Sequence, residues 1–253
     1  MGFVLSYRKF RSFYHNHKKS HWHSGGRKVY SACMTEEILF QVWVCSDSAC
    51  GLRFTALAGD RKASRCPVCR SATREVGLPY PQAEIPDGKD GASSREIVLL
   101  LDNLRSAWNV GSILRSADGA GVRAVVLCGV CPRPDHPRVT KTALGAEQSV
   151  AWRYEPDAVK AVQRLQAENY SIWALEGGAR SVPLFSRLTQ ALPNRICLVV
   201  GNELCGVDAG VLDLADCVVH RPMRGIRGSL NVAVALGAAI YALSSASGSE
   251  GSG

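Results

Sequence analysis

From residue 96 onward, short apolar runs recur along the chain, each bounded by glycine or polar residues. The run that follows Glu96 ends at Asp102, and its length suits one buried strand. The same pattern predicts five further strands, at Val122–Cys128, Val150–Tyr154, Ser171–Leu175, Ile196–Val200 and Cys217–His220. Near-continuous apolar strands are typical of parallel sheets, because helices cover both faces of such a sheet.

Between these strands the sequence changes to helical signals. Asn109 is suited to cap a helix that runs through Ala120, and Asp157 opens a helix that runs through Asn169. Further helices are predicted around Thr140–Leu144, over Ala209–Leu214, and from Asn231 to Leu243. Strands that alternate with helices predict an α/β domain with a parallel sheet.

Two of the predicted strands lead into glycine-rich loops. Ile196–Val200 is followed by Gly201 and a single carboxylate, Glu203, and Cys217–His220 is followed by residues 221–228. We expect these loops to stand side by side at the carboxyl edge of the sheet, where open α/β sheets bind ligands. No GxGxxG motif follows the first strand, so a nicotinamide-type site is not supported.

Before this domain, an alternating strand at Phe40–Val44 runs into the first of four paired cysteines. Fifteen residues separate the pairs Cys45/Cys50 and Cys66/Cys69. This arrangement resembles a zinc ribbon, although the first pair is spaced by four residues instead of two. Two disulfides or free thiols are the alternatives, and disulfides are disfavoured because no secretory signal is recognisable. A bound zinc would supply folding energy that so small a segment cannot obtain from a core.

Composition suggests the domain boundaries. We expect a basic disordered tail at residues 1–35, a zinc-ribbon-like module at 36–75, a linker rich in proline and glycine at 76–94, the α/β domain at 95–245 and a flexible tail at 246–253. No apolar run reaches the roughly 18 residues of a membrane span, so the sequence does not indicate a membrane protein. We expect a cytoplasmic protein.

The formal charge of +8 lies mainly in the first tail, because residues 1–35 hold seven Lys and Arg and no Asp or Glu. Three explanations of the tail stay open: an RNA-binding arm, a transit peptide, and upstream sequence that precedes a natural start at Met34. The rest of the chain is nearly neutral, so RNA binding by the main domain has to depend on local patches.

Three motifs resemble those of the SpoU (TrmH-like) branch of the SPOUT RNA methyltransferases. They are NxGxxxRxA beginning at Asn109, GNExxG beginning at Gly201, and PMxGxxxSLNVAVA beginning at Pro222. Their order and spacing match the family, and the resemblance covers Glu96 to Leu243. It does not extend to the first 95 residues, and it does not identify the RNA.

The resemblance implies a SPOUT-type sheet with a deep carboxy-terminal trefoil knot, a homodimer, and methyl transfer from S-adenosylmethionine to a ribose 2′-hydroxyl of tRNA or rRNA. The cofactor-binding residues that it implies are Val199, Val200, Gly201, Arg221, Met223 and Leu230. The catalytic residues that it implies are Asn109, Arg115, Glu203, Ser229 and Asn231. Arg221 departs from the family, which usually has an aliphatic residue before Pro-Met.

The role of Arg115 stays open, because a guanidinium with a pKa above about 12 is a poor proton acceptor. Clamping a phosphate is physically easier for it than acting as a base. Glu203 can equally be a structural hydrogen-bond acceptor, and Ser229 and Asn231 can be helix-start residues. Two other functions also stay open: a non-catalytic RNA-binding or ribosome-assembly protein, and a SPOUT enzyme that methylates a base nitrogen.

Overall fold

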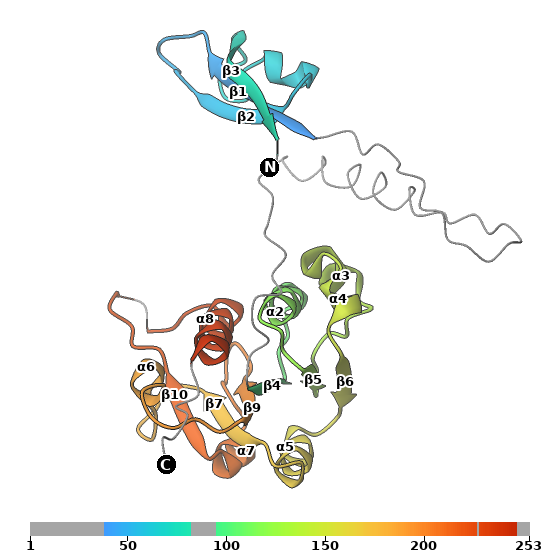
Figure 1. Ribbon diagram of the computed structural model, residues 1–253, viewed down its shortest axis with the longest axis vertical. Coiled ribbons are helices and arrows are strands. Elements are labelled where there is room, and N and C mark those ends of the chain that lie inside the picture. The colour runs from blue at the N-terminus through green and yellow to red at the C-terminus, as the bar shows by residue number, and fades with distance from the viewer. Residues whose placement is uncertain (1–37, 82–94, 227, 247–253) are drawn as a thin grey trace, which may run out of the picture. The chain divides into compact units, whose positions relative to one another are not determined.

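The computed structural model describes residues 38–81, 95–226 and 228–246 (Figure 1). The chain divides into two compact units, one on each side of residues 82–94. The tail predicted at residues 1–35 lies outside the described residues, and so does the tail predicted at residues 246–253 apart from Ala246. None of the described helices combines the length and the apolar character that crossing a bilayer requires.

The small unit is a three-stranded antiparallel sheet with the order β2-β1-β3. Its elements are β1 (Leu39–Cys45), β2 (Arg53–Leu57), the short 3-10 helix η1 (Arg61–Ser64) and β3 (Thr73–Pro81). In β1, the buried residues Gln41, Trp43 and Cys45 alternate with partly exposed ones, so one face of the sheet is covered and the other faces solvent. The strand predicted at Phe40–Val44 is therefore confirmed.

The predicted module boundary at residue 75 is wrong, because β3 continues to Pro81. The linker was placed from Val76 because residues 76–81 have no alternating pattern. The structure explains this irregularity: Gly77 has a φ of 75°, and the register of β3 against β1 shifts at this point. The Gln41 side-chain amide donates to the Val76 and Gly77 carbonyls, and prolines are tolerated because β3 is an edge strand.

The large unit holds a seven-stranded sheet with the order β6-β5-β4-β9-β7-β10-β8, and its strand pairs are parallel. Its strands are β4 (Glu96–Asp102), β5 (Ala124–Cys128), β6 (Trp152–Glu155), β7 (Ser171–Leu175), β8 (Val182–Pro183), β9 (Arg195–Val200) and β10 (Cys217–His220). The predicted α/β class with a parallel sheet is confirmed. The two strands that lead into the glycine-rich loops, β9 and β10, are not neighbours as expected, because β7 lies between them.

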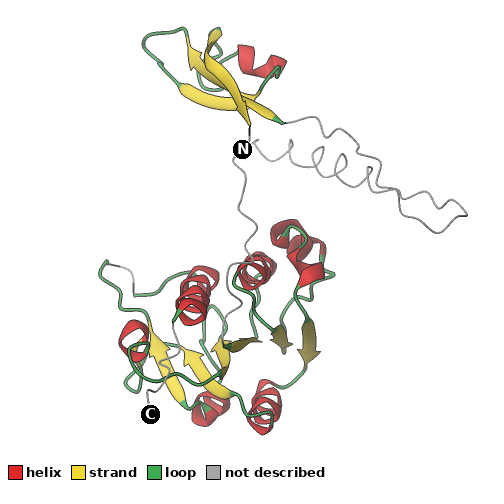
Figure 2. Cartoon of the chain, viewed as in Figure 1, coloured by secondary structure: helices red, strands yellow, loops and turns green. Residues whose placement is uncertain are grey.

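Helices cover both faces of this sheet (Figures 1 and 2). They are α2 (Ala107–Gly119), α3 (Pro137–Ala143), α4 (Ala146–Ser149), α5 (Ala158–Ala167), α6 (Leu184–Arg187), α7 (Ala209–Leu214) and α8 (Val232–Ser245). Side chains from α2, α3 and α8 share one buried cluster with the sheet, and side chains from α5 and α7 share another. The two clusters are the two faces of the sheet, so the core has three layers.

Candidate active site

The loop after β9 contacts the amino end of α2 through one carboxylate. Glu203 Oε2 accepts a hydrogen bond from the Arg105 N–H at 3.0 Å, and Oε1 accepts one from the Ser106 N–H at 3.1 Å. Free N–H groups and the positive end of the helix dipole make a helix amino end a favourable site for a carboxylate. Glu203 therefore joins the second motif to the helix that carries the first.

Asn109 links this carboxylate to the third motif. Its Nδ2 donates to Glu203 Oε1 at 2.9 Å, and its Oδ1 accepts from Asn231 Nδ2 at 3.1 Å. Asn231 is the N-cap residue of α8, and its own Oδ1 accepts from the Ala233 N–H at 2.9 Å. A continuous chain of hydrogen bonds thus brings together one residue from each of the three motifs.

The surroundings of Glu203 favour its charged form. Partial burial raises the pKa of the carboxyl, but the hydrogen bonds from the Arg105 N–H, the Asn109 amide and the Ser106 N–H together outweigh this effect and lower the pKa. A carboxylate held charged by three donors is suited to fix the positions of its neighbours.

Asn109 is not the N-cap residue that the sequence predicted. α2 begins at Ala107, and Ser106 is the cap, with its hydroxyl accepting from the Asn109 N–H at 3.3 Å. Serine is as good a cap as asparagine, so the sequence signal was ambiguous here. The shift moves the Asn109 side chain inside the first turn, where it is available to Glu203 and Asn231.

Arg115 lies on the same helix, but on a different side. It follows Asn109 by six residues, which at about 100° per residue turns its side chain well away from the Glu203 contact. The Arg115 side chain is exposed to solvent. The structure therefore brings Asn109, Glu203 and Asn231 together, and it leaves Arg115 open to a molecule that approaches from outside.

The residues implied in cofactor binding fall into two groups. Val199, Val200 and Gly201 are buried, and both valines are part of the core. Gly201 has a reason for its identity within the loop itself, because a Cβ there would lie 2.1 Å from the backbone of Gly206 and Val207. These three positions can offer a ligand only main-chain groups.

The second group is open to solvent. Met223 is 40% exposed and Leu230 is 44% exposed, and Ser229 is exposed between the third-motif loop and α8. The guanidinium of Arg221 lies 4.3 Å from the centre of the Phe185 ring. The Arg221 side chain is thus engaged in a cation–π contact, and the backbone around it is what it can present to a cofactor.

Two residues of the β4 edge escaped the sequence-based prediction, although they position the loop after β9. The buried Asp102 carboxylate accepts from the Asp208 N–H at 2.8 Å and from the Asn103 amide at 2.8 Å. The Asn103 carbonyl accepts from Asn202 Nδ2 at 2.7 Å. Burial raises the pKa of the Asp102 carboxyl, and the hydrogen bonds from Asp208 and Asn103 oppose this rise.

Glu176 has a similar role at the end of β7. Its Oε2 accepts from the Val207 N–H at 3.0 Å, and a Cβ on Gly206 would lie only 2.5 Å from that oxygen. The available signal was a polar residue directly after a buried strand, since Asp102 ends β4 and Glu176 follows β7. Both residues brace the same loop from either side of β9.

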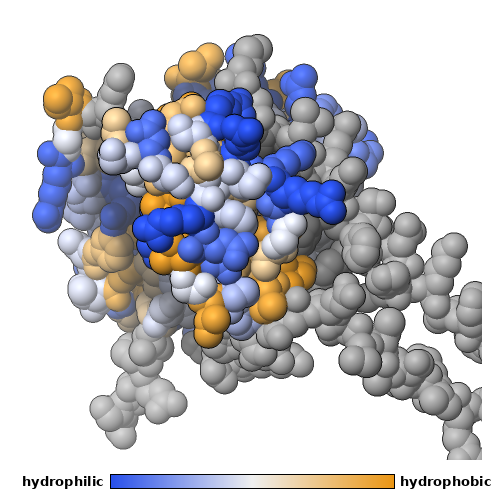
Figure 3. All heavy atoms as spheres, turned by 90° about the horizontal axis from the view of Figure 1, so that it is seen from above, coloured by the Kyte–Doolittle hydropathy of each residue, from blue (hydrophilic) through white to orange (hydrophobic). Residues whose placement is uncertain are grey.

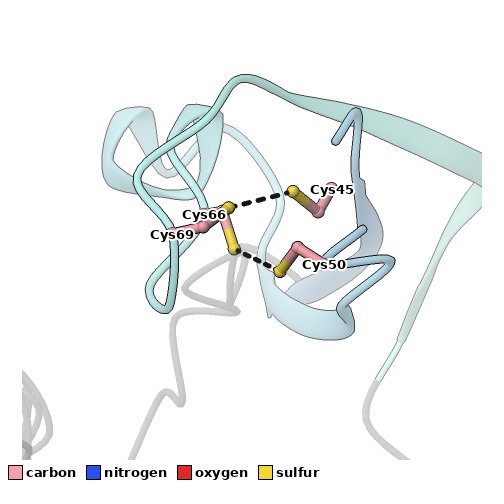
Figure 4. Close-up of side chains that lie close together, drawn as sticks. All are labelled: Cys45, Cys50, Cys66 and Cys69. Carbon is pink, nitrogen blue, oxygen red and sulfur yellow. Dashed lines mark hydrogen bonds between the residues drawn. The ribbon is translucent and has the colours of Figure 1, made fainter. Parts of the chain in front are cut away.

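The four cysteines of the small unit converge, as the sequence predicted (Figure 4). Their sulfur atoms all lie within 4.8 Å of one another, with Cys45 Sγ 3.4 Å from Cys69 Sγ and Cys50 Sγ 3.7 Å from Cys66 Sγ. Zn–S bonds of about 2.3 Å in a tetrahedron put neighbouring sulfurs about 3.8 Å apart, which these distances approach. They are well beyond the roughly 2.05 Å of a disulfide. The residues present therefore fit a tetrahedral zinc ion.

The chain matches the SpoU rRNA Methylase family over residues 96–241, which is more than half of its length. It belongs to this family. The matched region contains the whole hydrogen-bonded cluster of Asn109, Glu203 and Asn231, and the cysteine unit lies before it.

Relatives of this SpoU chain carry more specific names. The 23S rRNA (guanosine-2'-O-)-methyltransferase RlmB of Salmonella typhi is 32% identical over 165 residues, which are 65% of this chain and 66% of RlmB. The chain thus spans just under two thirds of the length of that relative. The 23S rRNA (guanosine(2553)-2'-O)-methyltransferase RlmP of Bacillus subtilis is 32% identical over 180 residues, 68% of each chain.

Solved structures show the same fold. The A. aeolicus TrmH/SpoU tRNA modifying enzyme has a TM-score of 0.53 and 25% identity, covering 60% of this chain and 76% of that one. The SpoU methyltransferase AviRb from Streptomyces viridochromogenes has a TM-score of 0.54 at 22% identity, covering 69% of this chain and 67% of AviRb. The second likeness concerns the fold alone.

Proposed function

We propose that this chain transfers a methyl group from S-adenosylmethionine to a ribose 2′-hydroxyl of ribosomal RNA. The observation that carries the proposal is the hydrogen-bonded series Glu203–Asn109–Asn231, because it joins one residue from each of three family motifs. The names of RlmB and RlmP favour ribosomal RNA over transfer RNA and a ribose oxygen over a base nitrogen.

The reaction requires a methyl donor held in line with the ribose oxygen, and S-adenosylmethionine supplies that methyl group on a sulfonium. In this chain the main-chain groups of Val200 and Gly201 and the exposed side chains of Met223 and Leu230 would hold it. Main-chain groups suit its polar parts, and the two apolar side chains suit its adenine and methylene surfaces.

The remaining residues hold the site together or position the RNA. Glu203 already accepts three hydrogen bonds and has a lowered pKa, so we assign it to holding Asn109 and not to accepting the 2′-hydroxyl proton. The exposed guanidinium of Arg115 is suited to clamp a phosphate and so orient the neighbouring ribose. Orientation of the reacting atoms is the main contribution that such a site can make to the rate.

We also propose that the active chain is a homodimer with a trefoil knot, as in the family that it resembles. Support for the dimer comes from α8, which holds no charged residue and exposes Val234 by 56% and Tyr241 by 48%. An apolar stripe of this kind is suited to pack against a second copy. Light scattering on a preparation that methylates RNA should give twice the chain mass, and a monomeric mass would contradict the dimer.

The function can be tested with labelled S-adenosylmethionine and total RNA from a strain that lacks the gene. We expect label in large-subunit ribosomal RNA, on the 2′-oxygen of one nucleotide after nuclease digestion. Asn109→Ala should lower this transfer, because it breaks both side-chain hydrogen bonds of the series. Asn194→Ala is a matched control, since Asn194 is exposed just before β9, at the amino edge of the sheet.

Label on a base, or transfer that Asn109→Ala leaves unchanged, would contradict the proposal. Label found only in transfer RNA would contradict ribosomal RNA as the substrate and would leave the proposed ribose methylation in place. Calorimetry and thermal-shift measurements with S-adenosylmethionine and its demethylated product report cofactor binding independently of methyl transfer.

A further inference from the structure

One face of the small unit's sheet is open to solvent. Residues paired directly across antiparallel strands project from the same face. The residues of β1 on the open face are Phe40, Val42 and Val44, each only partly buried. Their partners on β2 and β3 extend this face and are Leu57, Thr55, Arg53, Tyr80, Val76 and Arg74.

Aromatic side chains occupy one end of the open face. The rings of Phe40 and Tyr80 lie 6.1 Å apart between centroids, and Tyr80 is 42% exposed. The Tyr80 hydroxyl donates to Thr55 Oγ1 at 3.3 Å, which holds the ring over the strands. Leu57, paired with Phe40, is 39% exposed. The face thus presents a fixed aromatic surface that lacks a partner among the residues described.

Arginines occupy the other end. Arg53 and Arg74 are both exposed, and they flank Val44 from the two sides. None of the acidic residues of the described small unit is a strand residue of this face. Glu75 pairs with the buried Trp43 on the covered face, Asp47 accepts from the Ala49 N–H in the turn before Cys50, and Asp60 caps η1. The charge of the open face is therefore positive.

We propose that this open face binds single-stranded RNA, with bases stacked on Tyr80 and Phe40 and phosphates paired with Arg53 and Arg74. Aromatic rings at one end of a sheet face and arginines at its other end suit unpaired nucleotides, because every base offers a flat face and the backbone offers a charge at each step. A duplex would present its phosphates but not its base faces. The proposal rests on the proposed function for RNA as the substrate, and it adds a second contact outside the methyltransferase unit.

The rest of the unit surface offers a matched comparison. On the face of the molecule that Figure 3 draws, hydrophobic and hydrophilic residues are interspersed. Arg61 and Lys62 lie on η1, which packs on the covered face of the sheet: the Thr73 hydroxyl donates to the Ala63 carbonyl, and Thr73 pairs with Cys45. A double charge reversal at these two positions changes the unit's charge as much as one at Arg53 and Arg74.

The test measures binding of the full chain to a fluorescent single-stranded oligoribonucleotide of mixed sequence and to the duplex of the same sequence. Arg53→Glu with Arg74→Glu should weaken single-strand binding about tenfold or more, and Arg61→Glu with Lys62→Glu should change it much less. Tyr80→Ala should also weaken it about tenfold, because stacking on an aromatic ring contributes about 1–3 kcal/mol per base, while Tyr80→Phe should keep most of the affinity. Unchanged zinc content and thermal unfolding establish that each variant is folded.

If the two double charge reversals lowered the affinity for RNA equally, the proposal would be overturned, because the RNA would then be attracted by the overall positive charge of the small unit. Equal losses of Tyr80→Ala and Tyr80→Phe, or binding of the duplex as tight as of the single strand, would overturn stacking. Methyl transfer assayed on the same samples separates the two proposals. If the chain methylates RNA and the variants of the open face bind RNA as tightly as the wild type, the proposed RNA-binding face is refuted and the proposed function stands. If RNA binding depends on the open face but the chain transfers no methyl group, the proposed function is refuted and the face stands.

Discussion

Replacing Arg115 with alanine should lower methyl transfer to RNA by about 10²-fold or more while leaving the affinity for S-adenosylmethionine nearly unchanged. Arg115 is exposed on α2 and lies away from the contacts of Asn109 with Glu203 and Asn231. Its removal therefore disturbs neither the core nor the cluster. A charge that acts on RNA during the reaction contributes to turnover, and the substitution should change turnover more than ground-state binding of the cofactor.

Arg115→Lys should restore little of the lost activity, because an ammonium cannot reproduce the planar fork with which a guanidinium grips a phosphate. Arg123→Ala is the control: Arg123 has a side chain 71% exposed and lies just before β5, at the amino edge of the sheet. The measurement is initial rates of labelled methyl transfer, with cofactor affinity taken from calorimetry. Near wild-type transfer by Arg115→Ala would remove Arg115 from the site.

The elements that the sequence predicted best are those with sharp boundaries. β7, α7 and β10 match the predicted ranges Ser171–Leu175, Ala209–Leu214 and Cys217–His220. Each is a short, mainly apolar segment with an acidic residue directly beside it (Glu176, Asp208 and Asp216), so the local pattern marks at least one end. β8 and α6 were missed because elements of two and four residues are too short to show a period.

Features that depend on contacts between residues far apart in the sequence could not be predicted from local patterns. The insertion of β7 between β9 and β10 is a matter of sheet order, which apolar runs do not encode. The hydrogen bond from the Asp208 N–H to Asp102 joins residues 106 positions apart. Asn109 and Glu203 were selected by their motifs, and only the fold shows that they contact each other.

Two of the residues implied in cofactor binding show the same difference between what a local pattern predicts and what the fold determines. Gly201 was selected as a place where a cofactor approaches the backbone, but the close approach that the structure contains is that of Gly206 and Val207. Arg221, which departs from the family pattern, has its side chain stacked on Phe185. Its substitution for an aliphatic residue is therefore accommodated within the chain, by a neighbour from α6 that the sequence pattern did not indicate.

Removing metal from the four-cysteine site should unfold the small unit and leave the large unit folded. Few side chains of residues 38–81 are buried, and two of those belong to the four converging cysteines, Cys45 and Cys66. A core of this size cannot by itself stabilise a sheet of three strands. Structural zinc contributes about 10–16 kcal/mol in small domains of this kind, far more than the few buried contacts of Trp43 and Ala63.

The expected results are about one zinc per chain by elemental analysis and, after chelation, rapid hydrogen exchange in β1–β3 with unchanged protection in β4 and β9. Cys66→Ser should reproduce the effect of chelation, because Cys66 is fully buried and its sulfur lies 3.7 Å from that of Cys50. Cys205→Ser is the control, since Cys205 is exposed in the loop after β9 and is not among the four converging cysteines. Well under one zinc per chain, together with four titratable thiols in the folded protein, would show that the cysteines hold no metal. In that case the stability of the small unit would have to come from its sheet alone, and Cys66→Ser would then have an effect no larger than the loss of one buried side chain.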